Sequence, residues 1–497
     1  MAVYQRPGVY VEETLNPIAP AVGPNSQTVA AFIGGSDRGP VGPTLVTSWN
    51  EYVSIFGSWN TRTSNDLPIA VLLFFSNGGS QAFIVRALND SQTISTRVFA
   101  DGDALDTLTI NAANPGKWGN DIAITIENDG PNETFDLTVF YQGATSASIV
   151  ERFTDLSMTS TADRYAVSII NTQSKYINAV DEESTSTGAT KNPANQTTVN
   201  LAGVASDFPV NDELISGSSS ILDSVLSSLV LNAPGVTDTT AINTLISYAE
   251  SRDDVFLVVD SIASDIVSTQ ISTAATYTSS SLAAVYFPRL TIKDPTTTTP
   301  NVTKIVAPGG AIVGKYISTD SARGVFKAPA GLSTRLASAV AVYPLTNAQL
   351  DSLNTAAAPV NAIRFISGSG IVVMGARTLK AGYADRYIPV RRTLIYLRKS
   401  LTDLTQFAVF EPNDQRLWRQ LTSICSSFLT EFWQQGGLRG DVPTQAYFVK
   451  CDAETNTLAS IDNGEVRLEI GVALQRPAEF IVIKIGQFDG GTTVTVE

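Results

Sequence analysis

Acidic residues beside a predicted strand are the side chains of this chain best suited by type to acid–base chemistry. Asp253 and Asp254 precede the apolar run at 255–259, and Asp260 follows it. Ligands of open α/β sheets bind beyond the carboxyl ends of the strands, so Asp260 is the best-placed enzymatic candidate. No nucleophile, base or second acid stands at a catalytic spacing from it, and we expect a structural role.

The chain contains no histidine, and this absence excludes most other active-site types. Ser369 lies in Gly368-Ser369-Gly370, but the GxSxG spacing of a nucleophile elbow is not met and no imidazole exists to activate the hydroxyl. Cys425 and Cys451 are too few for a disulfide framework or a structural zinc site. We therefore expect buried free thiols, no catalytic residue, no metal and no cofactor.

The glycine-rich loop at 34–39 (GGSDRG) follows a predicted strand and suggests phosphate binding. It matches neither GxGxxG nor the GK[ST] ending of a P-loop, so we interpret it as a tight turn. Arg439-Gly440-Asp441, the tripeptide of integrin ligands, follows the helix-ending glycines at 436–437 and is also interpreted as a turn. Arg391-Arg392 lies between apolar segments, which indicates a packed element in a protein–protein contact.

Charge is distributed unevenly along the chain. The net charge of −14 argues against a surface that neutralises nucleic-acid phosphates. Residues 101–230 contain five Lys/Arg and eighteen Asp/Glu, whereas residues 376–450 contain eleven Lys/Arg and six Asp/Glu. The longest apolar run, 67–75, is about half of a membrane span, and the first residues lack the pattern of a secretory signal. We expect a soluble protein, made in a cytoplasm, with no nucleic-acid partner and no membrane insertion.

The elements that would position these residues fall into two structural patterns. Residues 1–25 contain four prolines and β-forming residues without a helical period, which predicts an extended N-terminal arm. Residues 26–98 and 231–390 alternate strands with helices, the pattern of a parallel sheet, and are predicted to be two parts of one α/β domain. Residues 99–230 carry short alternating apolar runs between turn-forming clusters, which predicts an acidic, β-rich insertion.

The last hundred residues are predicted to form a third unit. Asn413 or Asp414 begins a helix of close to six turns with a wide apolar stripe, and strands follow it. We assign residues 391–477 to a C-terminal α+β domain and residues 478–497 to a C-terminal strand arm. The predicted fold class is therefore a multidomain chain that combines α/β and α+β units.

Ten short blocks, in this order along the chain, resemble the tail sheath protein family of contractile-tailed bacteriophages and related contractile injection systems. They include RPGVYVEE (6–13), FIGGSDRGP, FFSNGG, PGKWGND (115–121), PGVTD (234–238), RGVFKAPAG (323–331), GARTL (375–379), PVRRTLIYL, VFEPND (409–414) and RPAEFIVI (476–483). Each block alone is weak, but their common order covers nearly the whole chain. The insertion at 99–230 resembles the family only in position and type.

The resemblance implies a subtilisin-like α/β domain without catalysis and arms that add strands to a sheet of neighbouring subunits. The implied N-terminal contact residues are Val3, Tyr4, Pro7, Gly8, Val9, Tyr10 and Val11. The implied C-terminal strand comprises Glu479, Phe480, Ile481, Val482, Ile483 and Ile485. With the charge asymmetry, it also suggests that the basic C-terminal unit faces an inner tube through Arg391, Arg392, Arg416 and Arg419, and that the acidic insertion points outward.

The implied function is that of a structural sheath subunit, which polymerises helically around a tail tube and contracts to drive the tube through a host cell envelope for genome or effector delivery. The implied partners are other copies of the chain, the tube protein, and baseplate and tail terminator proteins. The implied location is the virion tail, after assembly in the host bacterial cytoplasm. A non-contractile self-assembling tube or shell protein is the alternative; a subtilisin-like hydrolase is disfavoured by the lack of histidine.

Overall fold

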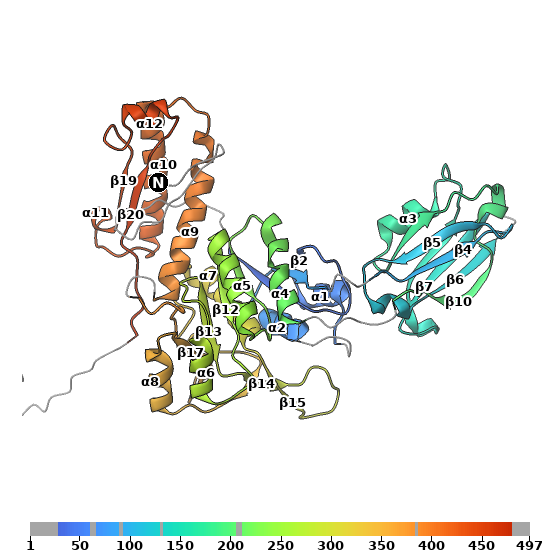
Figure 1. Cartoon of the computed structure of the whole chain (residues 1–497), viewed down its shortest axis with the longest axis horizontal. Helices are drawn as coiled ribbons and strands as arrows, with labels where there is room; N and C mark the ends of the chain where they lie inside the picture. The colour runs from blue at the N-terminus through green and yellow to red at the C-terminus, as the bar shows by residue number, and fades with distance from the viewer. Residues whose placement is uncertain are drawn as a thin grey trace, which may run out of the picture.

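The computed structural model describes residues 28–59, 66–88, 93–129, 133–204, 211–382 and 386–479. Its centre is an eight-stranded sheet of order β18-β17-β13-β12-β11-β1-β3-β2 (Figure 1). The six strands from β17 to β3 are parallel, and the edge strands β18 and β2 are antiparallel to their neighbours. The strands are β1 Val29–Gly34, β2 Thr44–Val46, β3 Ala82–Arg86, β11 Leu229–Asn232, β12 Val255–Val259, β13 Ala283–Phe287, β17 Val360–Ile366 and β18 Gly370–Val373.

The inner strands are continuous apolar runs because helices cover both faces of the sheet. β1, β11, β12 and β13 are buried along their whole length. The crossover from β1 to β3 and that from β11 to β12 run in opposite directions across the sheet, so helices α2 and α5 lie on opposite faces. The helices of this unit are α1 Trp49–Phe56, α2 Asp66–Ser76, α4 Asp212–Gly217, α5 Thr239–Arg252, α6 Val267–Ala274, α7 Gly309–Arg323 and α8 Asn347–Thr355.

Helices α2 and α7 approach each other closely because α7 presents glycines to α2. A Cβ on Gly310 would lie 2.2 Å from the Ala70 carbonyl oxygen, and one on Gly314 would lie 2.6 Å from the Phe74 carbonyl oxygen. No helix is predicted from the sequence over Gly309–Arg323, because the glycines there lower helix propensity. Tertiary packing therefore stabilises a helix that propensity alone disfavours.

An antiparallel β-sandwich is inserted between β3 and α4. Its two sheets have the orders β10-β6-β7-β8 and β4-β5-β9, and helix α3 (Ala166–Gln173) packs beside β9. They share one core that includes Trp118, Phe135 and Leu137. The strands are β4 Thr96–Ala100, β5 Asp106–Ala112, β6 Ile122–Asp129, β7 Thr134–Tyr141, β8 Ile149–Leu156, β9 Ile177–Asp181 and β10 Gln196–Asn200.

Residues 211–230 pack against the main sheet, although they are predicted to be part of the insertion. Ile215, Leu222 and Val225 are part of the same apolar core as β1 and β11. The serine-rich composition of this stretch resembles a loop, but its buried apolar residues lie on the side that contacts α5 and the sheet. The insertion strands therefore end at Asn200, and the α/β pattern resumes earlier than predicted.

The C-terminal unit is built on two long helices. Its elements are α9 Ile388–Thr405, α10 Gln415–Gln434, α11 Pro443–Ala446, β19 Tyr447–Lys450, α12 Leu458–Asp462 and β20 Glu469–Val472. Asp414 caps α10, as predicted, through bonds from the Arg416 and Leu417 amides. The first turns of α9 pack in the sheet core through Ile388 and Ile395, and its second half packs in the C-terminal core through Leu397 and Leu401.

A small antiparallel sheet of order β15-β14-β16 lies beside the main sheet. Its strands are Leu290–Lys293 (β14), Thr303–Val306 (β15) and Ala339–Val342 (β16), and β16 contacts β17 and β18. None of the helices in the described ranges is both long and apolar enough to cross a membrane.

Replacing Gly310 with alanine is expected to destabilise the protein by about 1–3 kcal/mol, because the added methyl group meets the α2 backbone. Gly217→Ala is the matched control: its Cβ has open space and its φ of −62° suits alanine, so stability should be unchanged or slightly higher. Chemical denaturation of both variants measures the difference. Equal stability of the two variants would contradict the packing described for α2 and α7.

Candidate assembly interface

The two-stranded sheet β19–β20 is incomplete in the described part of the chain. Tyr447 pairs with Val472 and Val449 with Ile470, and these four side chains cover the C-terminal core. On the opposite face Phe448 is 44% exposed. The outer edges of both strands pair with no further strand among the described residues. A two-stranded ribbon is marginally stable alone, and its free edges can accept further strands.

The first two turns of α10 carry two of the four arginines predicted to face a tube. Arg416 and Arg419 are exposed there. They lie beside Asp414, whose pKa is lowered by the hydrogen bond from the Leu417 amide and then by that from Arg416. Asn413 accepts a bond from the Trp418 indole and donates one to the Glu465 carbonyl, which ties this end of α10 to the segment before β20. Arg416 and Arg419 are therefore available for a partner.

The other two arginines lie inside the subunit. Arg392 donates two bonds to Asp320 of α7, at 2.9 and 2.5 Å, and its guanidinium stands 4.7 Å from the centre of the Tyr316 ring. Arg391 binds Asp253 at 3.1 Å. Arg392 is 3% exposed and Arg391 7%. The pair was predicted to make a protein–protein contact because apolar residues flank it, and the contact it makes is between α9 and the α/β unit of its own chain.

The predicted arms lie mostly outside the described residues. This applies to Val3, Tyr4, Pro7, Gly8, Val9, Tyr10, Val11, Phe480, Ile481, Val482, Ile483 and Ile485. Glu479 is described, and its carboxylate pairs with Arg377 of the α/β unit. Arg377 is not among the predicted site residues, and in the sequence it is marked only by its place in the GARTL block.

Asp260 holds loops of the α/β unit together. It is 1% exposed and accepts bonds from the backbone amides of Gly309 at 2.6 Å and Gly235 at 3.1 Å. Burial raises its pKa, while these bonds oppose the shift. It thus joins the first turn of α7 to the segment before α5. Asp254 pairs with Arg252, so the acidic residues considered for catalysis bind partners within the chain.

The loop at 34–39 joins the sandwich to the sheet. It follows β1, where the strand order reverses and α/β proteins often bind ligands. Arg38 is 8% exposed and lies 4.6 Å from the Tyr176 ring centre and 5.3 Å from that of Tyr141. Asp37 accepts a bond from the Tyr141 hydroxyl at 2.9 Å. Aromatic residues of the sandwich therefore occupy the place of a ligand. Local sequence patterns do not predict this contact, because its partners are about a hundred residues or more apart in the chain.

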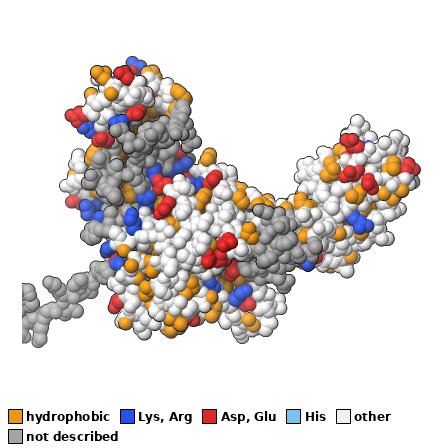
Figure 2. Space-filling view, viewed as in Figure 1, with side chains coloured by type: hydrophobic (Ala, Val, Ile, Leu, Met, Phe, Trp, Pro, Cys, Tyr) orange, Lys and Arg blue, Asp and Glu red, His pale blue; other side chains and the backbone are white. Residues whose placement is uncertain are grey.

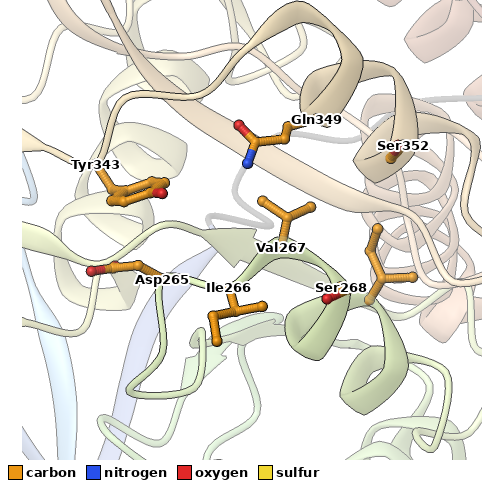
Figure 3. A pocket seen from close by; sticks show the side chains of 8 residues that line it. Asp265, Ile266, Val267, Ser268, Tyr343, Gln349 and Ser352 are labelled. Carbon is orange, nitrogen blue, oxygen red and sulfur yellow. The ribbon is translucent and has the colours of Figure 1, made fainter.

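A shallow hollow of about 520 Å³ lies between α6 and α8. Figure 3 shows Asp265, Ser268, Tyr343 and Gln349 around it, beside the apolar Ile266 and Val267. One carboxylate without a base or nucleophile forms no catalytic set. Across the described ranges, no group of three or more Cys, Asp or Glu residues is arranged to hold a metal ion.

Acidic side chains are more prominent than basic ones on the visible face of the sandwich, whereas acidic and basic side chains are mixed over the α/β and C-terminal units (Figure 2). The acidic excess of the sequence at 101–230 is thus visible on the sandwich.

The two cysteines are free, as predicted. Burial raises the pKa of the Cys425 thiol to about 12 and that of Cys451 to about 11. At pH 8 about one thousandth of Cys451 would be thiolate, so alkylation of the native protein should be about a hundredfold slower than that of a free thiol. Unfolding should expose two equivalents. Rapid labelling of the native protein in a thiol-titration assay would contradict the described burial.

Arg392→Met is expected to lower the free energy of unfolding by about 3–5 kcal/mol, because it leaves Asp320 without its buried partner. Arg416→Gln removes the same charge at an exposed position and should change stability by less than about 0.5 kcal/mol. Thermal and chemical denaturation compare the two. An Arg392→Met protein as stable as the Arg416→Gln control would show that the buried pair does not hold α9 in place.

Comparison with known proteins gives three kinds of match. Residues 384–487 match the model of the phage tail sheath C-terminal domain. A tail sheath protein of Vibrio phage KVP40 is 28% identical over 178 residues, which are 35% of this chain and 25% of that protein; the match thus spans a quarter of the relative's length.

Solved structures match over nearly the full length. The sheath of an extracellular contractile injection system, PVC, in its contracted state is 22% identical, covers 98% of this chain and 99% of its own, and has a TM-score of 0.60. The contracted helical sheath of the anti-feeding prophage AFP is 23% identical, with 98% and 100% coverage and a TM-score of 0.59. A sheath tail protein of Listeria innocua is 13% identical, with 87% and 90% coverage and a TM-score of 0.62. Residues 384–487 therefore match the phage tail sheath C-terminal domain, and the chain as a whole shares its fold with contractile sheaths.

Proposed function

We propose that the chain is the sheath subunit of a contractile tail, which polymerises helically around a tail tube and shortens to drive the tube through a cell envelope. The observation that carries the proposal is the match of 98% of the chain to sheath subunits solved in the contracted state, together with the family's C-terminal domain. Its action lies in contacts between copies, and the subunit is not an enzyme.

The arms of neighbouring subunits are proposed to complete the β19–β20 sheet. Two free edges can accept two strands, one from an N-terminal arm at 1–25 and one from a C-terminal arm. Main-chain hydrogen bonds supply the affinity, and alternating side chains fix the register. Because donor and acceptor surfaces differ, the contact does not close on itself and generates a helical filament.

Contraction is proposed to change the packing of the large units while the arm contacts persist. Such a lattice is bistable, and the extended state is the higher in free energy. The α/β unit is proposed to share the topology of subtilisin without its chemistry. The aspartates considered for catalysis here bind partners within the fold, which supports a structural role.

The exposed Arg416 and Arg419 are proposed to face the tube, and the acidic sandwich to point outward. The further proposed partners are the tube, baseplate and tail terminator proteins, in a virion tail or a related particle assembled in a bacterial cytoplasm. We propose three units with two arms: the α/β unit, the sandwich inserted after β3, and the C-terminal unit that begins within α9.

A non-contractile tube or shell protein is the second candidate, since arm-linked assembly alone would serve it equally. The matches to contracted sheaths favour the contractile alternative.

Deleting residues 1–20 should yield a folded monomer that cannot polymerise, because one strand donor is lost and the deleted segment precedes the first described element, β1. Sedimentation velocity of the full chain, the truncated chain and a Cys451→Ser control measures assembly, and circular dichroism checks the fold. The full chain and the control should sediment as long polymers. Polymers of the truncated chain would refute the arm contact.

A further inference from the structure

One ion pair holds the end of the described chain against the α/β sheet. β20 ends at Val472, and seven residues later the Glu479 carboxylate accepts bonds from Nε and Nη2 of Arg377, at 3.1 and 2.5 Å. The two side chains are 16% and 12% exposed. The chain after β20 runs back from the C-terminal unit toward the sheet (Figure 1). Two hydrogen bonds between one guanidinium and one carboxylate fix the relative orientation of the two groups as well as the distance between them.

Arg377 is oriented by contacts that do not involve Glu479. Its amide donates to Oδ1 of Asn361 at 2.7 Å, and Nδ2 of Asn361 donates to the Arg377 carbonyl at 2.7 Å. Asn361 lies on β17 and is 1% exposed. The Nη1 group donates to the Asn354 carbonyl in the last turn of α8, where a positive charge is favourable. These contacts therefore hold the guanidinium in an orientation that suits a carboxylate partner.

The same segment is attached once before it reaches Arg377. Leu474 bridges to Leu438, and the Gln475 side chain donates to the Leu438 carbonyl at 3.0 Å. Between these contacts and Glu479 lie only Arg476, Pro477 and Ala478. Without the ion pair, residues 477–479 would have to be ordered when the arm docks. Each backbone residue that must then be ordered on docking lowers affinity by about tenfold.

We propose that Arg377 and Glu479 form the anchor from which the C-terminal arm departs, so that Arg377 is a positioning residue for assembly with a second copy of this chain. This inference rests on the proposed function. Glu479, predicted to be the first residue of the inter-subunit strand, belongs instead to its own subunit. The anchor thereby sets the residue at which the arm starts.

Glu479→Gln is expected to raise the critical concentration for polymerisation at least about tenfold, because the three residues 477–479 are no longer held in place before the arm docks. Glu465→Gln removes a carboxylate from an exposed pair with Arg467 and should have no effect on polymerisation. Both monomers should melt within a few degrees of the unaltered chain. Light scattering against protein concentration measures polymerisation.

Two insertion variants distinguish an ion pair that positions the arm from one that only stabilises the fold. A Gly-Ser insertion directly after Glu479 lengthens the free arm and should impair assembly while the ion pair remains. The same insertion between Gln475 and Arg476 adds slack between two fixed points and should leave assembly unchanged. Equal behaviour of the two insertions, or normal assembly of Glu479→Gln, would overturn the anchor while the sheath function stands. Failure of the unaltered chain to polymerise would overturn both.

Discussion

A β-strand satisfies its backbone hydrogen bonds only beside another strand, and the proposed assembly depends on this constraint. The hairpin β19–β20 covers the C-terminal core on one face, but its outer edges have no strand partner in the described ranges. The sequence at both ends of the chain is rich in β-forming residues, which also need a strand partner. Strand exchange between copies satisfies both needs, and it does so without an active site.

Strand exchange can transmit force only if the units within each subunit are joined firmly. Buried polar contacts supply these joints. Arg392 and Asp320 connect α9 to α7, and Arg38, between Tyr141 and Tyr176, connects the sandwich to the end of β1. Burying a charged group without a partner is energetically costly, so each of these contacts requires one specific geometry. Helix α9 adds a continuous apolar connection, because its two halves pack in different cores.

Local patterns predicted the elements well where one signal dominated. The apolar runs at 29–34 and 255–259 are buried parallel strands, and the stripe after Asp414 is the long helix α10. Helix α7 was missed because its stability comes from glycines that admit α2. The roles of Arg38, Arg391, Arg392 and Arg377 depend on partners distant in sequence, which no local pattern can reveal. The charge asymmetry and the family resemblance therefore placed Arg391 and Arg392 at a contact with the tube, whereas both are buried within the subunit.

Electron microscopy of the purified chain distinguishes a sheath built by strand exchange from other assemblies. We expect hollow, striated tubes built from one helical repeat of the subunit. In complex with a tube, the sheath should exist in two forms that differ in axial rise, with the arms of neighbouring copies completing the β19–β20 sheet. Compact, monodisperse particles at all concentrations, or tubes whose β19–β20 sheet remains two-stranded, would contradict a sheath built by strand exchange.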